Sequence, residues 1–320
     1  MVIPKRKPNG VLERIGNTPL LQMRRIPIEL NNPNVEIYAK AEQFNPGGSV
    51  KDRAALRIVE DAERKGRMHR GKTLLDSTSG NTGIAYAMVC AVKGYRCELV
   101  MPSNVSKERV LTVRAYGAEI TYSDPLEGSD GALLLAKQLY EEKPDQYYLP
   151  CQYDNPSNWQ AHFDTTGGEI IRQTGGRVTH FAAGIGTSGT AVGTSRRLKA
   201  FNSAVKTYGV EPESGFHGLE GLKHIESAIT PGIYDASTLD GTFYMKTEES
   251  YDMARRLAME EGVLVGKSSG AAMLAAMQLA RGLEEAVIVI VFPDGGSRYL
   301  STPLFEPPVS LQKIRKAGLP

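Results

Sequence analysis

Residues 180–200, HFAAGIGTSGTAVGTSRRLKA, contain the local pattern that decides the fold. The apolar run His180–Ala183 predicts a buried strand, and the stretch Thr190–Ala200 predicts a helix. The glycines and hydroxyl side chains between them predict a tight connection at the helix N-terminus. The same order of strand, polar turn and helix recurs along the chain. It is typical of βαβ units, in which helices cover both faces of a mostly parallel sheet.

This alternation extends from residue 35 to residue 292. We expect strands at Val35–Ala41, Thr73–Asp76, Cys97–Met101, Glu119–Tyr122, Tyr147–Leu149, His180–Ala183, Lys206–Glu211 and Val287–Phe292. We expect helices at Ser49–Gly66, Thr82–Gly94, Lys107–Gly117, Ser129–Glu142, Asn158–Gln173, Thr190–Ala200, Glu248–Glu261 and Gly270–Arg281. Gly215–Thr242 is predicted to be a long loop, and Val263–Val265 is strand-like. The proline-rich tail Thr302–Pro320 is predicted to be extended or partly disordered. The fold class is therefore α/β. With 320 residues, two twisted sheets are expected, and one large unit is the other option.

Composition and charge exclude several classes of protein. The chain has 38 Lys and Arg against 36 Asp and Glu, a balance that argues against nucleic acid and anionic membranes as partners. No run approaches the roughly 18 apolar residues of a membrane-spanning helix, and the basic amino terminus leads into no apolar segment. The three cysteines form no CxxC pair, and the five histidines show no metal-ligand spacing. We therefore expect a cytoplasmic protein without a metal.

The segment Asn45–Arg53, NPGGSVKDR, joins a strand to a helix and carries an unusual lysine. The Pro-Gly-Gly sequence predicts a tight turn, and Ser49 is a candidate N-cap. Lys51 then falls in the first helical turn, where the partial positive charge of the helix N-terminus disfavours a cation. Such a position lowers the pKa of an amine and suits a nucleophile. The alternative is a surface lysine whose stem lies along the helix.

Two further junctions have the composition of anion sites. Ser77–Gly83, STSGNTG, and Gly184–Thr190, GIGTSGT, place free backbone N–H groups and hydroxyls at helix N-termini. Neither matches a Walker loop, and no dinucleotide-binding pattern follows. In Gly266–Gly270, Ser268 is either a helix cap or a hydroxyl that faces a cofactor ring. Each loop alone is common at a turn, but together they indicate a phosphorylated cofactor, a carboxylate substrate and an amine between them.

These motifs resemble those of the fold-type II pyridoxal-phosphate enzymes, and most closely those of cysteine synthase (O-acetylserine sulfhydrylase) and the core of cystathionine β-synthase. The resemblance extends from Gly16 in GNTPL to Thr302 in RYLST. It implies a smaller domain of residues 45–155 and a larger domain of residues 1–44 with 156–320. The loop around Pro231–Ser237 looks most like the B-type cysteine synthases.

The resemblance also assigns roles to individual residues. It implies that Lys51 binds pyridoxal phosphate covalently, that Ser268 faces the pyridine nitrogen, and that Asn81 faces the ring hydroxyl. The cofactor phosphate would lie against Gly186, Thr187, Ser188, Gly189 and Thr190; Ser188 stands where many relatives have glycine. The substrate carboxylate would bind to Thr78, Ser79, Gly80, Asn81, Thr82 and Gln152. Lys223 and His224 stand where B-type enzymes tend to have arginine, and they either attract a doubly charged anion or lie in a solvated loop. Asp294, just past the last strand, is expected to lie behind the site.

The activity that the resemblance implies is β-replacement on an activated serine. O-acetylserine or O-phosphoserine would react with sulfide or thiosulfate to give cysteine or S-sulfocysteine, in a homodimer. The enzymatic alternative is cystathionine β-synthase, which joins serine and homocysteine. A regulatory protein that keeps the fold and a nucleotide-binding protein are alternatives of other classes, and the intact set of Lys51, Asn81 and Ser268 argues against the first of these.

Overall fold

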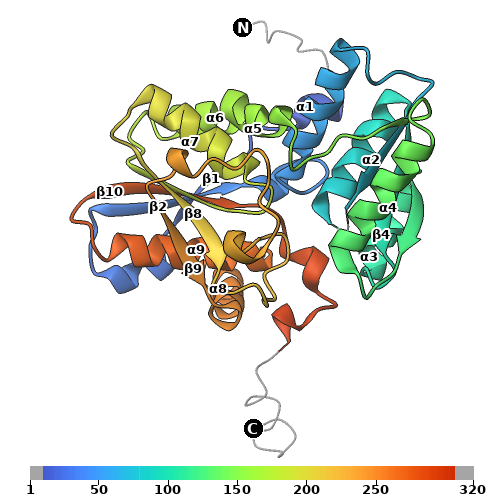
Figure 1. The fold of residues 1–320 in the computed structure, drawn as a ribbon. Helices are drawn as coiled ribbons and strands as arrows, with labels where there is room; N and C mark the ends of the chain where they lie inside the picture. Colours follow the sequence, from blue (N-terminus) through green and yellow to red (C-terminus); the bar gives the residue numbers. More distant parts are fainter. Residues whose placement is uncertain (1–9, 79, 307–320) are drawn as a thin grey trace, which may run out of the picture.

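A computed structural model describes residues 10–78 and 80–306, and it contains two sheets that lie side by side (Figure 1). The larger sheet has the order β1 (Leu20–Met23), β2 (Val35–Ala41), β10 (Ala286–Phe292), β7 (His180–Gly184), β8 (Lys206–Pro212) and β9 (Gly241–Met245). The smaller sheet has the order β5 (Glu119–Ser123), β4 (Arg96–Pro102), β3 (Thr73–Ser77) and β6 (Tyr147–Tyr148). Every named pair is parallel except β1 with β2. The predicted α/β class with two mostly parallel sheets is confirmed.

Helices cover both sheets. They are α1 (Lys51–Arg64), α2 (Asn81–Lys93), α3 (Lys107–Ala115), α4 (Gly128–Glu142), α5 (Pro156–Ala161), α6 (Gly167–Gln173), α7 (Gly189–Phe201), α8 (Thr247–Glu260) and α9 (Lys267–Ala280). Short 3₁₀ turns lie at Leu12–Arg14, Ile26–Leu30, Glu42–Phe44, Ile225–Ser227, Ala236–Thr238, Gly296–Tyr299 and Pro303–Phe305. A π-helical turn, His162–Thr166, connects α5 to α6.

The sequence of β10, AVIVIVF, shows how one strand serves two cores. Because successive side chains point to opposite faces of a sheet, Ile288 and Ile290 pack with α9, whereas Val289 and Val291 pack with α6 and α7. Both faces are apolar, as expected for a parallel strand covered by helices on both sides. The smaller sheet repeats this arrangement: Leu74 belongs to the core on one face of β3, and its neighbour Leu75 belongs to the core on the other.

The structure differs from the sequence predictions at three places. The short edge strands β1 and β9 were not predicted, and β9 ends what was expected to be one long loop. Val263–Val265 forms no strand, because only Val265 pairs, in an isolated bridge with Gly295. The expected helix Asn158–Gln173 is divided by the π-helical turn, which inserts extra backbone between α5 and α6.

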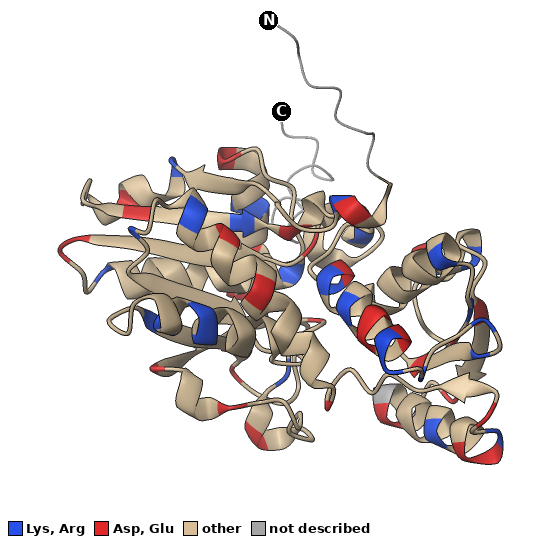
Figure 2. Ribbon diagram, turned by 90° about the horizontal axis from the view of Figure 1, so that it is seen from above, with Lys and Arg blue, Asp and Glu red and all other residues tan. Residues whose placement is uncertain are grey.

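All four strands of the smaller sheet fall within residues 45–155, and all six strands of the larger sheet fall outside that range. The domain boundaries themselves stay a prediction. The tail was expected to be extended or partly disordered, but its described part forms a 3₁₀ turn at Pro303–Phe305. Residues 307–320 lie outside the described residues. Among the described helices, none is long and apolar enough to span a membrane. Lys and Arg alternate with Asp and Glu over both parts of the molecule, as the near-neutral charge implies (Figure 2).

Candidate active site

Three of the four segments that were singled out from the sequence meet because each follows the carboxyl end of a strand. The fourth, Gly266–Gly270, follows Val265, which bridges to Gly295 beside Asp294. β2 leads to the turn before Lys51, β3 to the loop before Asn81, β7 to the loop before α7, and β10 to Asp294. In parallel α/β sheets, ligands bind at this edge. One pocket there is lined by predicted residues from both sheets, namely Lys51, Asn81, Gly186, Thr187, Ser188, Thr190 and Ser268, together with Glu220 and Asp294.

Lys51 is the first residue of α1, as its place after the glycine turn predicts. Ser49 is not the N-cap, because Val50 precedes the helix in a helical conformation without a side-chain cap. The Ser49 hydroxyl instead accepts a 3.3 Å hydrogen bond from the Lys51 N–H. The fully buried Asp52 accepts a 2.6 Å hydrogen bond from Gly47 N–H and so fixes the turn. Burial lowers the pKa of the Lys51 amine, and the negative charge of Asp294 opposes this fall.

The loop before α7 has the geometry of an anion cradle. A Cβ atom on Gly186 would lie 2.1 Å from the Gly221 carbonyl oxygen, so the close approach of these two loops requires glycine. Ser188 adopts a left-handed conformation with φ 69°, a backbone conformation that glycine adopts more readily than serine. Its hydroxyl is buried and has no partner among the described residues. The N–H groups of the first turn of α7 adjoin this unpaired hydroxyl.

Two side chains that the sequence did not assign to the site hold this loop in place. Asn158 donates 3.0 Å to the Thr187 hydroxyl and 2.8 Å to the Gln152 carbonyl oxygen. His162 contacts the Thr190 hydroxyl at 3.3 Å, and burial lowers its pKa to about 3, so the ring is neutral near pH 7. The π-helical turn brings His162 against the loop.

Of the predicted carboxylate-binding residues that the structure describes, Asn81 lines the pocket, and Thr82 lies beside it in the first turn of α2. The Thr82 hydroxyl donates 2.8 Å to Oε1 of the buried Gln152 and thereby orients the Gln152 amide. Gly80 N–H approaches the Thr78 hydroxyl at 3.4 Å, at the limit of a hydrogen bond. Ser79 lies outside the described residues. Whether these groups bind a carboxylate stays a prediction, but the first-turn N–H groups of α2 have the polarity that an anion requires.

Lys223 and His224 have different neighbours. The Lys223 ammonium lies 5.0 Å from the ring centre of Tyr153, next to Gln152 in sequence. His224 instead contacts the Ser227 hydroxyl at 2.8 Å and packs edge-on against Tyr244. Whether either side chain attracts an anion stays a prediction.

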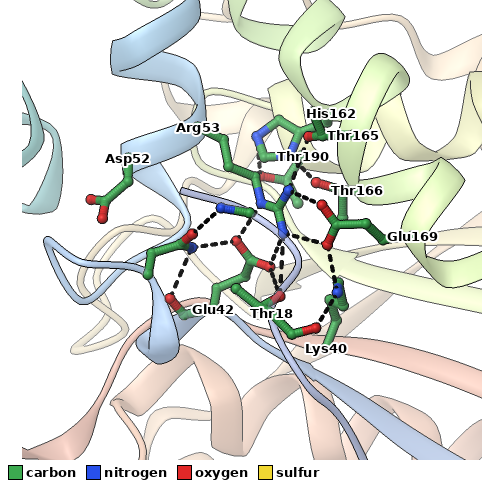
Figure 3. A network of polar contacts seen from close by, with 12 residues as sticks. Thr18, Lys40, Glu42, Asp52, Arg53, His162, Thr165, Thr166, Glu169 and Thr190 are labelled. Carbon is green, nitrogen blue, oxygen red and sulfur yellow. Dashed lines mark hydrogen bonds and ion pairs between the residues drawn. The ribbon is translucent and has the colours of Figure 1, made fainter. Parts of the chain in front are cut away.

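A buried ionic network surrounds Arg53, two residues after Lys51 in α1, and connects this helix to the larger sheet (Figure 3). Arg53 pairs with Glu42 at 2.7 Å and with Glu169 at 2.6 Å, and Lys40 pairs with Glu169 at 2.7 Å. Burial alone would raise the pKa of Glu169, but the hydrogen bonds and charges of Arg53 and Lys40 outweigh it and lower the pKa to about 2. Asp52 points away from the network, and burial raises its pKa to about 7. The sequence offered no signal for these partners, which lie up to 129 residues apart, as Lys40 and Glu169 do.

Glu220, which lines the pocket, connects the two parts of the molecule. Arg109 on α3 donates 2.6 Å to one Glu220 oxygen, and Lys267 on α9 donates 3.1 Å to the other. Burial would raise the pKa of Glu220, but the charges of these two cations lower it overall. The pair Arg109–Glu220 therefore joins a helix of the smaller sheet to the loop after β8.

Comparison with known proteins agrees with this arrangement. A family described as pyridoxal-phosphate dependent enzyme matches residues 11–294, and the chain belongs to this family. A cysteine synthase from Aquifex aeolicus is 53% identical over 299 residues, which cover 92% of this chain and 91% of the relative. A cysteine synthase B from Pseudomonas aeruginosa is 43% identical over 297 residues, 93% of this chain and 97% of the relative. A cysteine synthase structure from Entamoeba histolytica, 36% identical, superposes with a TM-score of 0.89 over 95% of this chain and 93% of that chain.

The cofactor of this family is pyridoxal phosphate, and the residues of the pocket fit it. The fit rests on three observations: an amine of lowered pKa, the unpaired buried hydroxyl of Ser188 at a helix N-terminus, and a glycine cradle without space for a side chain. The first suits an aldehyde and the other two suit a phosphate.

Proposed function

We propose that this protein makes cysteine by β-replacement on an activated serine, O-acetylserine or O-phosphoserine, with sulfide or thiosulfate as the sulfur donor. The observation that carries the proposal is the convergence of Lys51, the Gly186–Thr190 loop and Ser268 on one pocket. The relatives named cysteine synthase, at 53% and 43% identity, support the same activity. Thiosulfate would give S-sulfocysteine in place of cysteine.

Lys51 is assigned the covalent attachment of the cofactor and the movement of the substrate Cα proton. When bound, pyridoxal phosphate accepts the electrons that the Cα–H bond releases, so that a β-substituent can depart. Because burial lowers the pKa of Lys51, a larger fraction of its amine is neutral near pH 7 and able to take that proton. The same group then returns the proton after sulfur has added. Lys51→Ala should abolish turnover, and substantial residual β-replacement would refute the assignment.

The other pocket residues are assigned binding and orientation. Gly186, Thr187, Ser188, Gly189 and Thr190 would hold the phosphate, and Asn81 would face the ring hydroxyl. Ser268 would face the ring nitrogen, where a hydroxyl, unlike a carboxylate, does not keep that nitrogen protonated. This choice favours loss of a β-substituent over racemisation or transamination. Thr78, Ser79, Gly80, Thr82 and Gln152 would bind the substrate carboxylate.

Lys223 is assigned the attraction of a doubly charged anion, either thiosulfate or the phosphate of O-phosphoserine. Its position beside Tyr153 supports this role, whereas the contacts of His224 with Ser227 and Tyr244 argue for a lesser one. Lys223→Ala should raise KM for thiosulfate more than KM for sulfide, and the exposed Lys246→Ala is the matched control. Equal losses with both donors would contradict the role.

The runner-up activity is cystathionine β-synthase, which uses the same amino-acid carbon but homocysteine as nucleophile. Since an activated serine can serve either reaction, the nucleophile separates them. Steady-state assays with O-acetylserine, O-phosphoserine and serine against sulfide, thiosulfate and homocysteine give the answer. Turnover with homocysteine that exceeds turnover with sulfide and thiosulfate would favour the runner-up.

The proposal also includes a cytoplasmic homodimer. The three free thiols, Cys90, Cys97 and Cys151, support a reducing compartment, and the resemblance to cysteine synthases supports the dimer. Sedimentation analysis tests the oligomeric state, and a monomer at micromolar concentration would contradict it. Cell fractionation tests the compartment.

A further inference from the structure

Asp294 is a buried acid in the pocket wall that the proposed chemistry does not use. It follows β10 directly, is 1% exposed, and lines the same pocket as Lys51 and Asn81. A buried carboxylate is costly unless its oxygens are paired or face a cation. The contacts of its two oxygens therefore indicate what the residue does.

Oδ2 of Asp294 fixes the side-chain amide of Asn81. It accepts 2.7 Å hydrogen bonds from Asn81 Nδ2 and from the Tyr299 hydroxyl. Arg298 donates to the opposite end of the amide, at Asn81 Oδ1. With a carboxylate at the nitrogen end and a guanidinium at the oxygen end, the amide has one favourable orientation. The second N–H of Nδ2 remains for a group in the pocket.

The backbone around Asp294 holds the two segments that carry Lys51 and Ser268. Ser49 and Asp294 form an antiparallel bridge, and Val50 N–H donates 2.8 Å to the Pro293 carbonyl oxygen. Gly266 N–H donates 3.2 Å to the Asp294 carbonyl oxygen. A change at position 294 therefore acts on both sides of the pocket.

Oδ1 of Asp294 is buried and has no hydrogen-bond partner among the described residues. A Cβ atom on Gly266 would lie 2.1 Å from it, so this glycine leaves the space that the oxygen occupies. The charged or titratable groups around the carboxylate are Lys51 from α1, Arg109 from α3, and Arg298 and Tyr299 from the turn after β10. Of these groups, Lys51 is the one that must gain and lose a proton in the proposed reaction.

We propose that Asp294 is a positioning residue of this site: it aims the Asn81 amide into the pocket, and it supplies the negative charge that faces the Lys51 amine. The inference rests on the roles proposed above for Lys51 and Asn81. Its second part has a definite sign, because a negative neighbour stabilises the protonated amine. Removal of the charge should therefore lower the pKa of Lys51 further than burial alone has done.

The test of the charge uses the apoprotein, so it does not depend on catalysis. The rate of Lys51 modification by an amine reagent, followed by peptide mass spectrometry, is measured against pH in wild type and in Asp294→Asn. We expect the midpoint to fall by about one pH unit. Tyr299→Phe, which removes a partner of Oδ2 and keeps the charge, should not lower it. Asp294→Ser serves the same comparison should the asparagine variant fail to fold. An unchanged midpoint in the charge-free variant would overturn the proposal.

The test of positioning is a double-mutant cycle on the affinity of the apoprotein for pyridoxal phosphate. Asp294→Ala and Asn81→Ala should each weaken binding, and the loss in the double variant should be smaller than the product of the two single losses, because part of the effect of Asp294 acts through Asn81. Losses that multiply would show independent effects and contradict the role. If wild type itself forms no coloured complex with pyridoxal phosphate, the proposed function fails, while the pH midpoint of Lys51 still decides the inference on charge.

Discussion

Replacement of Glu169 by glutamine removes one charge from the buried network that connects α1 to the larger sheet. Glu169 accepts bonds of 2.6 and 2.8 Å from Arg53 and pairs with Lys40 at 2.7 Å, with its side chain 6% exposed. The variant keeps the shape of the side chain but leaves the two cations with less compensating charge. Because the interior screens charge poorly, this loss should lower the free energy of unfolding.

The magnitude follows from the pKa of Glu169, which lies at about 2 in the folded protein against an ordinary value of 4.5. At about 1.4 kcal/mol for each pH unit, this difference contributes about 3 kcal/mol. The folded pKa is depressed, so the contribution is complete above pH 4.5 and is lost as the pH falls toward 2. For a chain of this length, the expected fall in Tm is about 4 to 5 °C.

The assay is urea unfolding of the apoprotein, followed by circular dichroism at pH 7 and again at pH 3. Urea is chosen because guanidinium, a salt, would screen the charges under test. The control is Glu249→Gln, since Glu249 and Lys246 pair at 3.3 Å with both side chains more than half exposed, and it should change stability by less than about 1 kcal/mol. The stabilising role of the Glu169 charge would be refuted if Glu169→Gln were as stable as the control. It would also be refuted if the variant lost the same free energy of unfolding at both pH values.

Three further predictions concern the pocket and its walls. Gly186→Ala places a Cβ atom 2.1 Å from a backbone oxygen of the neighbouring loop, so the affinity for pyridoxal phosphate should fall about tenfold or more. The control is Gly168→Ala, whose Cβ atom would have nothing within 4 Å and which should bind pyridoxal phosphate normally. Equal affinities of the two variants would contradict the cradle. Ser188→Gly relieves a left-handed serine and should raise the free energy of unfolding by up to about 1 kcal/mol; a less stable variant would be inconsistent with strain there. Arg109→Gln removes the bond to Glu220 between the two parts of the molecule, so it should raise KM for the activated serine. Because the ion pair is then absent, KM of the variant should be insensitive to salt, in contrast to KM of wild type. The same salt dependence of KM in both proteins would argue against the link.

Local features of the site could be predicted from the sequence because each is encoded within about ten consecutive residues. The glycine turn places Lys51 at the start of α1, and the Gly186–Thr190 loop lies at the start of α7 as expected. Parallel strands then bring such loops to one edge without further information. The π-helical turn was missed because its apolar spacing continues the pattern of an ordinary helix.

Interactions between distant segments could not be predicted in this way. Asp294 and Asn81 are 213 residues apart, and Arg109 and Glu220 are 111 residues apart. A single sequence shows the charges but not their partners, because pairing depends on the order of the strands. The backbone conformation of Ser188 was also hidden, since serine gives no local signal for a positive φ.

The central claim is that Lys51 holds the cofactor at the junction of the two sheets. The direct measurement is reduction of the protein with borohydride after addition of pyridoxal phosphate, followed by proteolysis and mass spectrometry of the lysine-containing peptides. We predict a pyridoxyl group on Lys51. A label on another buried lysine, such as Lys40 or Lys267, or no label at all, would contradict it.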